Sequence, residues 1–206
     1  MVSQRTKKAI RSCFIELLNE KPFDRISVKD IAERCGVTRN AFYYHYADIY
    51  ALLAEIFELE IAKVAERVEE YDSWQEAFCA ATAFAAENRN AVYHLFNSSN
   101  ESLLERYYYE SVLTAMRGYI WKEAAGLPMA EHHILTLARF YTAALTGLTG
   151  DWLRSGMKGD ANTFIEEIGD MLDGNIRSAL ERCSRRDAQE AAEKAEEAVL
   201  KESEAG

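Results

Sequence analysis

Apolar residues recur along this chain at intervals of three and four positions, the spacing that gathers side chains on one face of an α-helix. In residues 4–20, the apolar positions are Ile10, Cys13, Phe14, Leu17 and Leu18. Only two prolines and ten glycines occur in the chain, which leaves room for long helices. The sequence therefore predicts an all-α fold, with further helices over residues 48–70, 74–88, 90–96, 103–125, 130–155 and 160–183.

Residues 26–46 differ from these long stripes because they predict two short helices joined by a tight turn. Ser27 supplies a side-chain acceptor and Asp30 an acid at the start of the first helix, where backbone N–H groups are unpaired and the helix dipole is positive. Gly36 is expected to end this helix, since glycine adopts a left-handed C-terminal conformation at little cost. Thr38 is the expected N-cap of the second helix.

The second short helix sorts its side chains by spacing. Phe42 and Tyr46 are four positions apart, so they share a face and are expected to pack inward. The other faces carry polar and aromatic groups, as a major-groove reader requires, because arginine can bond guanine edges, asparagine adenine edges, and hydroxyl or ring N–H groups phosphates. If the consecutive aromatic residues were instead all core, this short helix would have to be buried on every side. The candidate DNA contacts are Ser27, Thr38, Arg39, Asn40, Tyr43, Tyr44 and His45.

One motif in this segment resembles the helix-turn-helix of the TetR family of bacterial transcriptional regulators: Asp30-Ile-Ala-x-x-x-Gly-Val-Thr-x-x-x-Phe-Tyr-Tyr-His-Tyr46. The resemblance implies a three-helix DNA-binding head over residues 1–47 and a helical effector-binding and dimerisation body over residues 48–183. It also implies a homodimer on a palindromic DNA operator, most often a repressor released by a small-molecule effector. The sequence departs from the family pattern at residues 47–50, which lack the Lys or Arg that grips phosphate in many members.

The charge is distributed unevenly between the two parts. The chain carries a net charge of −10, which argues against general binding of nucleic acid. Residues 1–50, however, hold nine basic and six acidic side chains, so this part is +3 and the remainder −13. Phosphate contact is therefore expected from the head, and a dimer with two heads would strengthen it. Lys7, Lys8 and Arg11 lie off the apolar face of the first helix, where they either contact phosphate or form a solvated surface.

The middle of the chain is rich in aromatic residues with scattered hydroxyl groups. Such a helical body can enclose a pocket for a small molecule, although aromatic residues at helical spacing are usually core. The family resemblance favours the pocket, because most members bind an effector in this region. The candidate pocket residues are Tyr93, Phe96, Tyr107, Tyr108, Met116 and Trp121.

The last two predicted helices are candidates for a dimer interface. Small residues spaced three and four apart line one face of helix 130–155 and would let another helix approach closely. Two such helices from each subunit would form a four-helix bundle, as in the resembled family; the alternative is packing within one subunit only. The candidate interface residues are Ala143, Gly147, Gly150, Trp152, Ile168, Leu172 and Ile176. Residues 184–206 are rich in Ala and Glu and predict a solvated acidic tail.

Other chemistry finds little support in the sequence. The four cysteines are far apart, so Cys13 and Cys35 are expected to be buried free thiols, with a redox switch as the alternative. The histidines show no metal-ligand spacing, and no metal or cofactor is expected. The longest uncharged run, residues 140–150, is about half of a membrane span, and charges interrupt the N-terminus, so a cytoplasmic protein is expected.

Two further functions compete with a ligand-responsive repressor. A helical enzyme or ligand carrier with a degenerate head would need a catalytic arrangement, but the sequence has no nucleophile elbow, metal triad or phosphate loop. No enzymatic activity is therefore expected. A DNA-binding regulator without an effector would instead act by recruiting a partner through the acidic tail or body.

Overall fold

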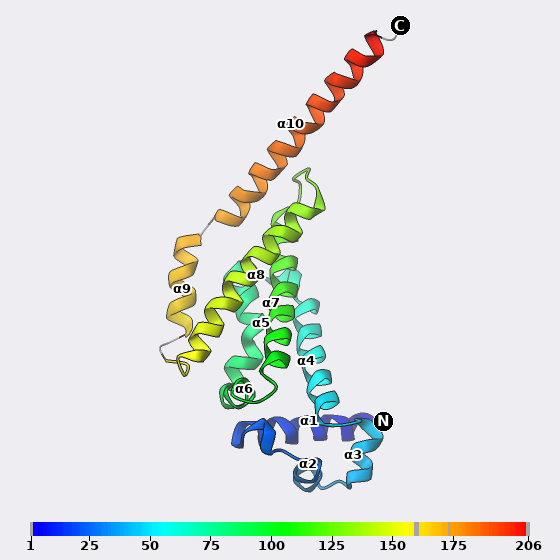
Figure 1. Ribbon diagram of the computed structural model, residues 1–206, viewed down its shortest axis with the longest axis vertical. Coiled ribbons are helices and arrows are strands. Elements are labelled where there is room, and N and C mark those ends of the chain that lie inside the picture. The colour runs from blue at the N-terminus through cyan, green and yellow to red at the C-terminus, as the bar shows by residue number, and fades with distance from the viewer. Residues whose placement is uncertain (1, 159–160, 173, 205–206) are drawn as a thin grey trace.

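The computed structural model describes residues 2–158, 161–172 and 174–204, and all regular structure within these ranges is helical (Figure 1). The predicted all-α fold class, a helix-turn-helix head followed by a helical body, is confirmed. The elements in chain order are α1 (Val2–Glu20), η1 (Phe23–Arg25), α2 (Val28–Cys35), α3 (Arg39–His45), α4 (Ile49–Glu66), η2 (Val68–Glu70), α5 (Trp74–Glu87), α6 (Arg89–Phe96), α7 (Glu101–Glu123), α8 (Glu131–Arg154), α9 (Ala161–Leu172) and α10 (Asn175–Glu204).

The head consists of α1, α2 and α3, which lie together at one end of the molecule (Figure 1). Phe14, Ile31 and Phe42 come from these three helices, and each side chain is completely buried. Their cluster continues without a break into the body through Leu52 of α4 and Leu95 of α6. Because head and body share this core, α4 and α6 are the elements through which one part can influence the other.

The body is built around α7, which packs against α4, α5, α6 and α8. The rings of Phe57 and Tyr107 stack at 4.0 Å with planes 6° apart, and Phe84 meets Phe57 edge-on. About three turns further along α7, a Cβ added to Gly118 would lie 2.4 Å from Cβ of Val68, so the glycine allows η2 to rest directly on this helix. These contacts hold the helices that border the cavity described below.

The predicted helix over residues 160–183 is wrong, because the structure has two helices there. α9 ends at Leu172, and α10 begins at Asn175. Gly174 lies between them with φ +68°, a left-handed conformation that favours glycine and ends a helix. The apolar period continues across this break, so hydrophobic spacing alone did not reveal it.

α10 continues well past the point where the sequence predicted a tail, and it projects away from the body (Figure 1). Ile176, Leu180 and Ser184 are buried at its start, and residues 188–198 are exposed. Alanine and glutamate are strong helix formers, so this segment stays helical without a core. Within the described residues, no helix combines the length and the apolar character needed to cross a bilayer.

Candidate nucleic-acid interface and internal cavity

The start of α2 is fixed by a capping box. The Ser27 hydroxyl accepts from the Asp30 backbone N–H at 3.2 Å, and the Ser27 backbone N–H donates to the Asp30 carboxylate at 2.8 Å. The same hydroxyl donates to Asp30 at 2.7 Å. These hydrogen bonds, from the Ser27 side chain and then its backbone, with Lys21 adding to them, lower the pKa of Asp30 to about 2. The hydroxyl of Ser27, a predicted DNA contact, is therefore already engaged at the helix terminus.

The turn and the start of α3 follow the sequence prediction. Gly36 has φ +67° and closes α2, where its N–H bonds the Ala32 and Glu33 carbonyls. Thr38 caps α3, because its hydroxyl accepts from the backbone N–H of Ala41 at 3.1 Å. Phe42 and Tyr46 are 0% and 3% exposed, so they anchor the inner face of the short helix as expected.

The opposite side of α3 presents polar and aromatic groups to the surroundings. Arg39 and Asn40 are exposed, and Tyr43 and Tyr44 are 56% and 81% exposed. The His45 ring is half-buried and meets the Tyr44 ring edge-on at 5.0 Å. A guanidinium, an amide and phenol hydroxyls thus project from one rigid, capped helix, and these are groups able to bond base edges and phosphates.

Glu55 of α4 ties the head together, a role that the sequence analysis missed. Its carboxylate accepts from Lys7 and from Arg11 at 2.6 Å each, and from the Tyr46 hydroxyl at 3.1 Å. Burial works to raise the pKa of Glu55, but the hydrogen bonds from Lys7 and Tyr46 outweigh it and leave this pKa below its usual value. Lys7 and Arg11 are therefore paired with an acid, and Lys8 stays exposed on the same helix.

Cys13 and Cys35 are free thiols, as expected, but both are half-buried where full burial was predicted. The Cys35 thiol donates to the Ala9 carbonyl at 3.7 Å. Burial, and next the neighbouring Cys13, raise the pKa of Cys35 to about 12. A thiol with so high a pKa is protonated and poorly reactive at neutral pH.

A cavity of about 660 Å³ lies in the body between α5, α6, α7 and α8. Its wall is mainly apolar and aromatic, and three residues predicted for a pocket, Phe96, Tyr107 and Tyr108, take part in it. The Tyr108 hydroxyl donates to the Thr149 hydroxyl at 3.0 Å, and burial raises the pKa of Tyr108 so that this phenol stays neutral. A volume of this size suits a drug-sized molecule.

The other three predicted pocket residues do not line this cavity, and their assignment is corrected. Tyr93 and Trp121 are 44% and 45% exposed on the outer faces of α6 and α7. Met116 is completely buried in a cluster with Ala115 and Ile120 and is not among the lining residues. Aromatic composition therefore indicated the right region, while the direction of each side chain depended on how α6 and α7 are rotated in the packed body.

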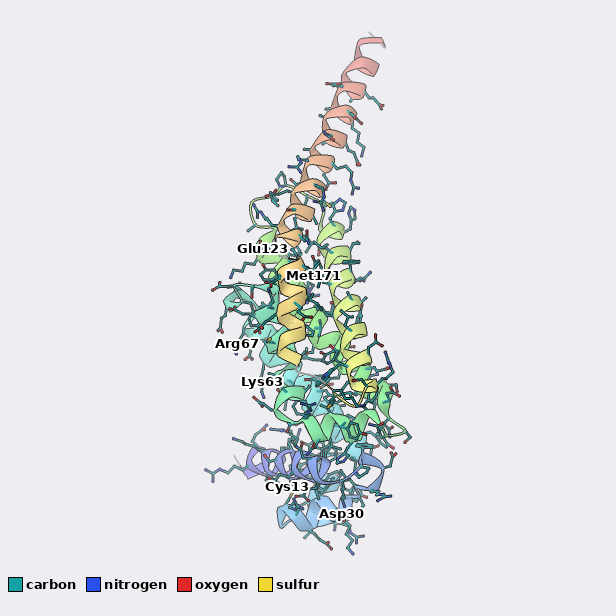
Figure 2. All side chains as sticks on the ribbon, turned by 90° about the vertical axis from the view of Figure 1, so that its left-hand side faces the viewer. Cys13, Asp30, Lys63, Arg67, Glu123 and Met171 are labelled. Carbon is teal, nitrogen blue, oxygen red and sulfur yellow. The ribbon has the colours of Figure 1, made fainter. Side chains whose placement is uncertain are left out.

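The residues predicted for a dimer interface divide into two groups in the subunit, and the interface itself stays a prediction. Ala143, Gly147, Gly150 and Trp152 border the cavity, and the first two are also exposed on α8. Ile176 is 3% exposed in the core, with Ile168 and Leu172 packed against the same cluster. The outer faces of α8 and α9 also expose Phe140 by 64%, Leu148 by 38% and Met171 by 74%, the last labelled on α9 in Figure 2.

The sequence held a signal for this outer face. Phe140, Ala144 and Leu148 recur every four residues on α8, beside the stripe of small residues formed by Ala143 and Gly147. All three are exposed.

The beginning of α6 is shared by the cavity and the head. Arg89, its first residue, lines the cavity and donates to the Met157 carbonyl. Two positions away, the Ala91 backbone N–H donates to the Asn19 side chain of α1 at 3.1 Å. His94 donates from Nδ1 to the Leu18 carbonyl at 2.8 Å, so both ends of α6 are tied to the helix that supports the head.

Comparisons with known proteins match both parts of the chain. The family model described as "Bacterial regulatory proteins, tetR family" matches residues 15–56, and "Transcriptional regulator C-terminal region" matches residues 72–174. The transcriptional activator DhaS of the dhaKLM operon in Lactococcus lactis is 29% identical over 84 residues, which is 41% of this chain and 45% of DhaS. The transcriptional regulator AcrR of Shigella flexneri is 32% identical over 71 residues, 34% of this chain and 33% of AcrR. The matched stretches thus span less than half of either relative.

Two solved structures share the fold. The dihydroxyacetone kinase operon activator DhaS superposes with a TM-score of 0.68 at 20% identity, over 84% of this chain and 96% of that one. NalD, the secondary repressor of the MexAB-OprM efflux pump in Pseudomonas aeruginosa, superposes with a TM-score of 0.56 at 21% identity, over 82% of this chain and 96% of NalD.

Among the described residues, no group of three or more His, Cys, Asp or Glu side chains is placed to hold a metal ion.

Proposed function

The chain belongs to the TetR family of bacterial transcriptional regulators, and on this premise we propose that it is a homodimeric repressor released from a palindromic operator by a small-molecule effector. One observation carries the proposal: α3 is capped by Thr38 and anchored by Phe42, yet it leaves Arg39, Asn40 and Tyr43 exposed. A short, rigid helix with such groups outward is what entry into the major groove requires.

In this proposal the head, residues 1–47, makes all DNA contacts. Arg39 bonds a guanine edge and Asn40 an adenine edge. Tyr43, Tyr44 and His45 hold phosphates and fix the register. Ser27 and Thr38 contribute mainly as caps, because their hydroxyl groups are engaged in hydrogen bonds to the α2 and α3 backbones.

The body, residues 48–183, supplies the dimer interface in this proposal. Phe140 and Leu148 on α8 and Met171 on α9 are large apolar side chains left exposed in one subunit. A second copy placed against them would bury this surface and complete a helical bundle. The symmetric pair would then present its two α3 helices to half-sites about 34–36 Å apart.

The cavity is the proposed effector site. A ligand that prefers a body shape with displaced heads shifts the population away from DNA. The bonds of Asn19 and Leu18 to α6, and of Glu55 to α1, are among the contacts through which such a shift would reach the head. The protein in this proposal acts in the cytoplasm, without enzymatic activity and without a cofactor.

Activation and partner recruitment are the alternatives to repression. The names of the relatives include both an activator and a repressor. The exposed part of α10, residues 188–198, offers a surface for recruitment. A reporter gene behind the operator shows whether the protein activates or represses transcription. Removal of residues 188–206 tests recruitment, since regulation would then be lost while DNA binding remains.

The decisive experiment measures operator binding. The inverted repeat protected by the purified protein in the DNA flanking its gene serves as the operator, and fluorescence anisotropy gives the affinity. Arg39→Ala is expected to weaken binding about tenfold to hundredfold, since a bidentate base contact contributes about 1–3 kcal/mol. Arg117→Ala removes an exposed arginine of α7 and serves as the matched control. Equal operator affinity of the two variants would contradict the assigned reading face.

A further inference from the structure

The cavity wall carries two arginines whose electrostatic surroundings differ. Arg154 pairs with Asp151 at 2.8 Å, and Glu101 and Glu105 also act on its charge. Arg89, by contrast, has no carboxylate within 4.0 Å among the described residues. Its guanidinium donates to a neutral acceptor, the Met157 carbonyl. Arg89 is exposed, so the rim of a mainly apolar cavity holds a positive charge that has no carboxylate partner among the described residues.

Three features concentrate this positive charge at the cavity. The Arg89 guanidinium lies over the Trp152 ring, 5.1 Å from its centroid, which fixes the direction of the side chain. Arg89 is also the first residue of α6, where the helix dipole is positive. Beside it, the Trp152 indole N–H is buried without an acceptor among the described residues. An anion with two acceptor oxygens can accept hydrogen bonds from the Arg89 guanidinium and the Trp152 indole N–H, and the positive end of α6 attracts it.

The rest of the wall defines the remainder of the ligand. Phe96, Tyr107 and Trp152 contribute aromatic surface, and Val92, Leu104 and Met157 aliphatic surface. The cavity carboxylate, Glu105, lies close enough to Arg154 to act on its charge. A cationic ligand would thus find this acid already balanced by an arginine, while an anionic ligand would find Arg89 open.

We propose that the cavity binds an apolar or aromatic monocarboxylate, with its carboxylate against Arg89 and its hydrocarbon along the aromatic wall. This inference rests on the proposed effector site and names its ligand class. A guanidinium and a carboxylate match as a two-pronged, charge-assisted pair, which is stronger than a bond between neutral groups. The carboxylate would replace the Met157 carbonyl as the partner of Arg89.

Replacement of that carbonyl bears on the loop after α8. Met157 is buried with φ +58°, a left-handed conformation that a bulky residue rarely adopts. Its contact with Arg89 helps to hold the loop in this conformation. A carboxylate that takes Arg89 frees the loop next to α6, the helix bonded to α1.

The test uses three probes of one shape and different charge: 4-(biphenyl-4-yl)butanoate, its primary amide and the corresponding amine. Isothermal titration calorimetry measures each against the full-length wild type, Arg89→Gln and the matched control Arg117→Gln, which removes an exposed arginine of α7 outside the cavity lining. The acid is expected to bind the wild type about tenfold to hundredfold more tightly than the amide. Arg89→Gln should remove this preference without weakening the amide, and Arg117→Gln should retain it.

Several results would overturn the inference. They are equal binding of acid and amide, an acid preference that survives in Arg89→Gln, tightest binding of the amine, and no binding of any probe. Thermal melting of Arg89→Gln confirms that the variant is folded. Operator affinity measured without any probe separates the two proposals. If the wild type binds its operator but shows no acid preference, the inferred ligand class is wrong and the proposed DNA-binding function stands.

Discussion

The head and the body place their functional surfaces in different ways. The face of α3 is made by residues 38–46, and its caps and inward anchors lie in the same short segment. The cavity draws its wall from α5, α6, α7, α8 and the residues that follow. A local surface can be derived from helix caps and spacing, whereas an assembled surface depends on how separate helices are rotated against one another.

The largest expected loss of stability comes from removing the Phe42 ring, which anchors α3 in the head core. Phe42→Ala deletes a completely buried ring from the head core, so the free energy of unfolding is expected to fall by about 3–5 kcal/mol. Chemical denaturation measures the change. Tyr44→Ala removes a ring that is 81% exposed and should stay within about 0.5 kcal/mol of the wild type. Similar losses in both variants would show that α3 is not anchored through Phe42.

A second experiment tests whether the exposed apolar face of α8 forms an interface between two subunits. Phe140→Asp places a charge on the 64% exposed apolar position of α8, and burial of an unpaired charge in an interface is strongly unfavourable. The variant is expected to become monomeric at concentrations where the wild type is a dimer, as measured by sedimentation velocity. Ala83→Asp, at an exposed position of α5, is the control and should leave the mass unchanged.

Glu55 of α4 joins the body to the head, and its ion pairs should make the stability of the protein depend on pH. The folded-state pKa of this carboxyl is lowered, so its contribution to stability is full above the unfolded pKa near 4.5 and is lost as pH falls through the folded pKa. The free energies of unfolding of the wild type and Glu55→Gln, measured by chemical denaturation, should differ at pH 7 by about 1–3 kcal/mol and converge in acid. A constant difference down to pH 2 would contradict the ion-pair role.

The smallest effect is expected from the projecting part of α10. Removal of residues 188–206 takes away a segment whose described part, residues 188–198, is exposed helix, and it should change the stability of the body by about 0.5 kcal/mol or less. Asp187→Asn tests the anchor just before it, because this carboxylate accepts from the Ala130 backbone N–H at 2.8 Å and pairs with His133 at 2.9 Å. The point variant should therefore destabilise the body more than the truncation, which thermal melting can check.

Much of the head was predictable because its signals are local. Ser27, Gly36 and Thr38 each act on neighbouring backbone groups, and the spacing of Phe42 and Tyr46 gives the buried face directly. Glu55 escaped prediction because its partners lie 44 and 48 residues away, on a helix that crosses it only in the folded state.

The body was predictable as a set of helices but not as a site. Periodicity gave α4 to α8 with small shifts at their ends, and aromatic composition pointed to the region of the cavity. Tyr93 and Trp121 were assigned to the cavity wall but are exposed, whereas Trp152, assigned to a dimer interface, also lines the cavity. Each of these residues lies on the expected helix and faces a different neighbour.

The sequence alone determined the all-α class, the helix-turn-helix and the outward groups of α3, because caps and spacing act within a few residues. Only the tertiary structure decided which side chains line the cavity, which apolar residues remain uncovered on α8 and α9, and that Arg89 borders the cavity without an acidic partner in the part of the chain that the structure describes. The physical reason is that a helix fixes the order of its faces, while packing against distant helices decides where each face points.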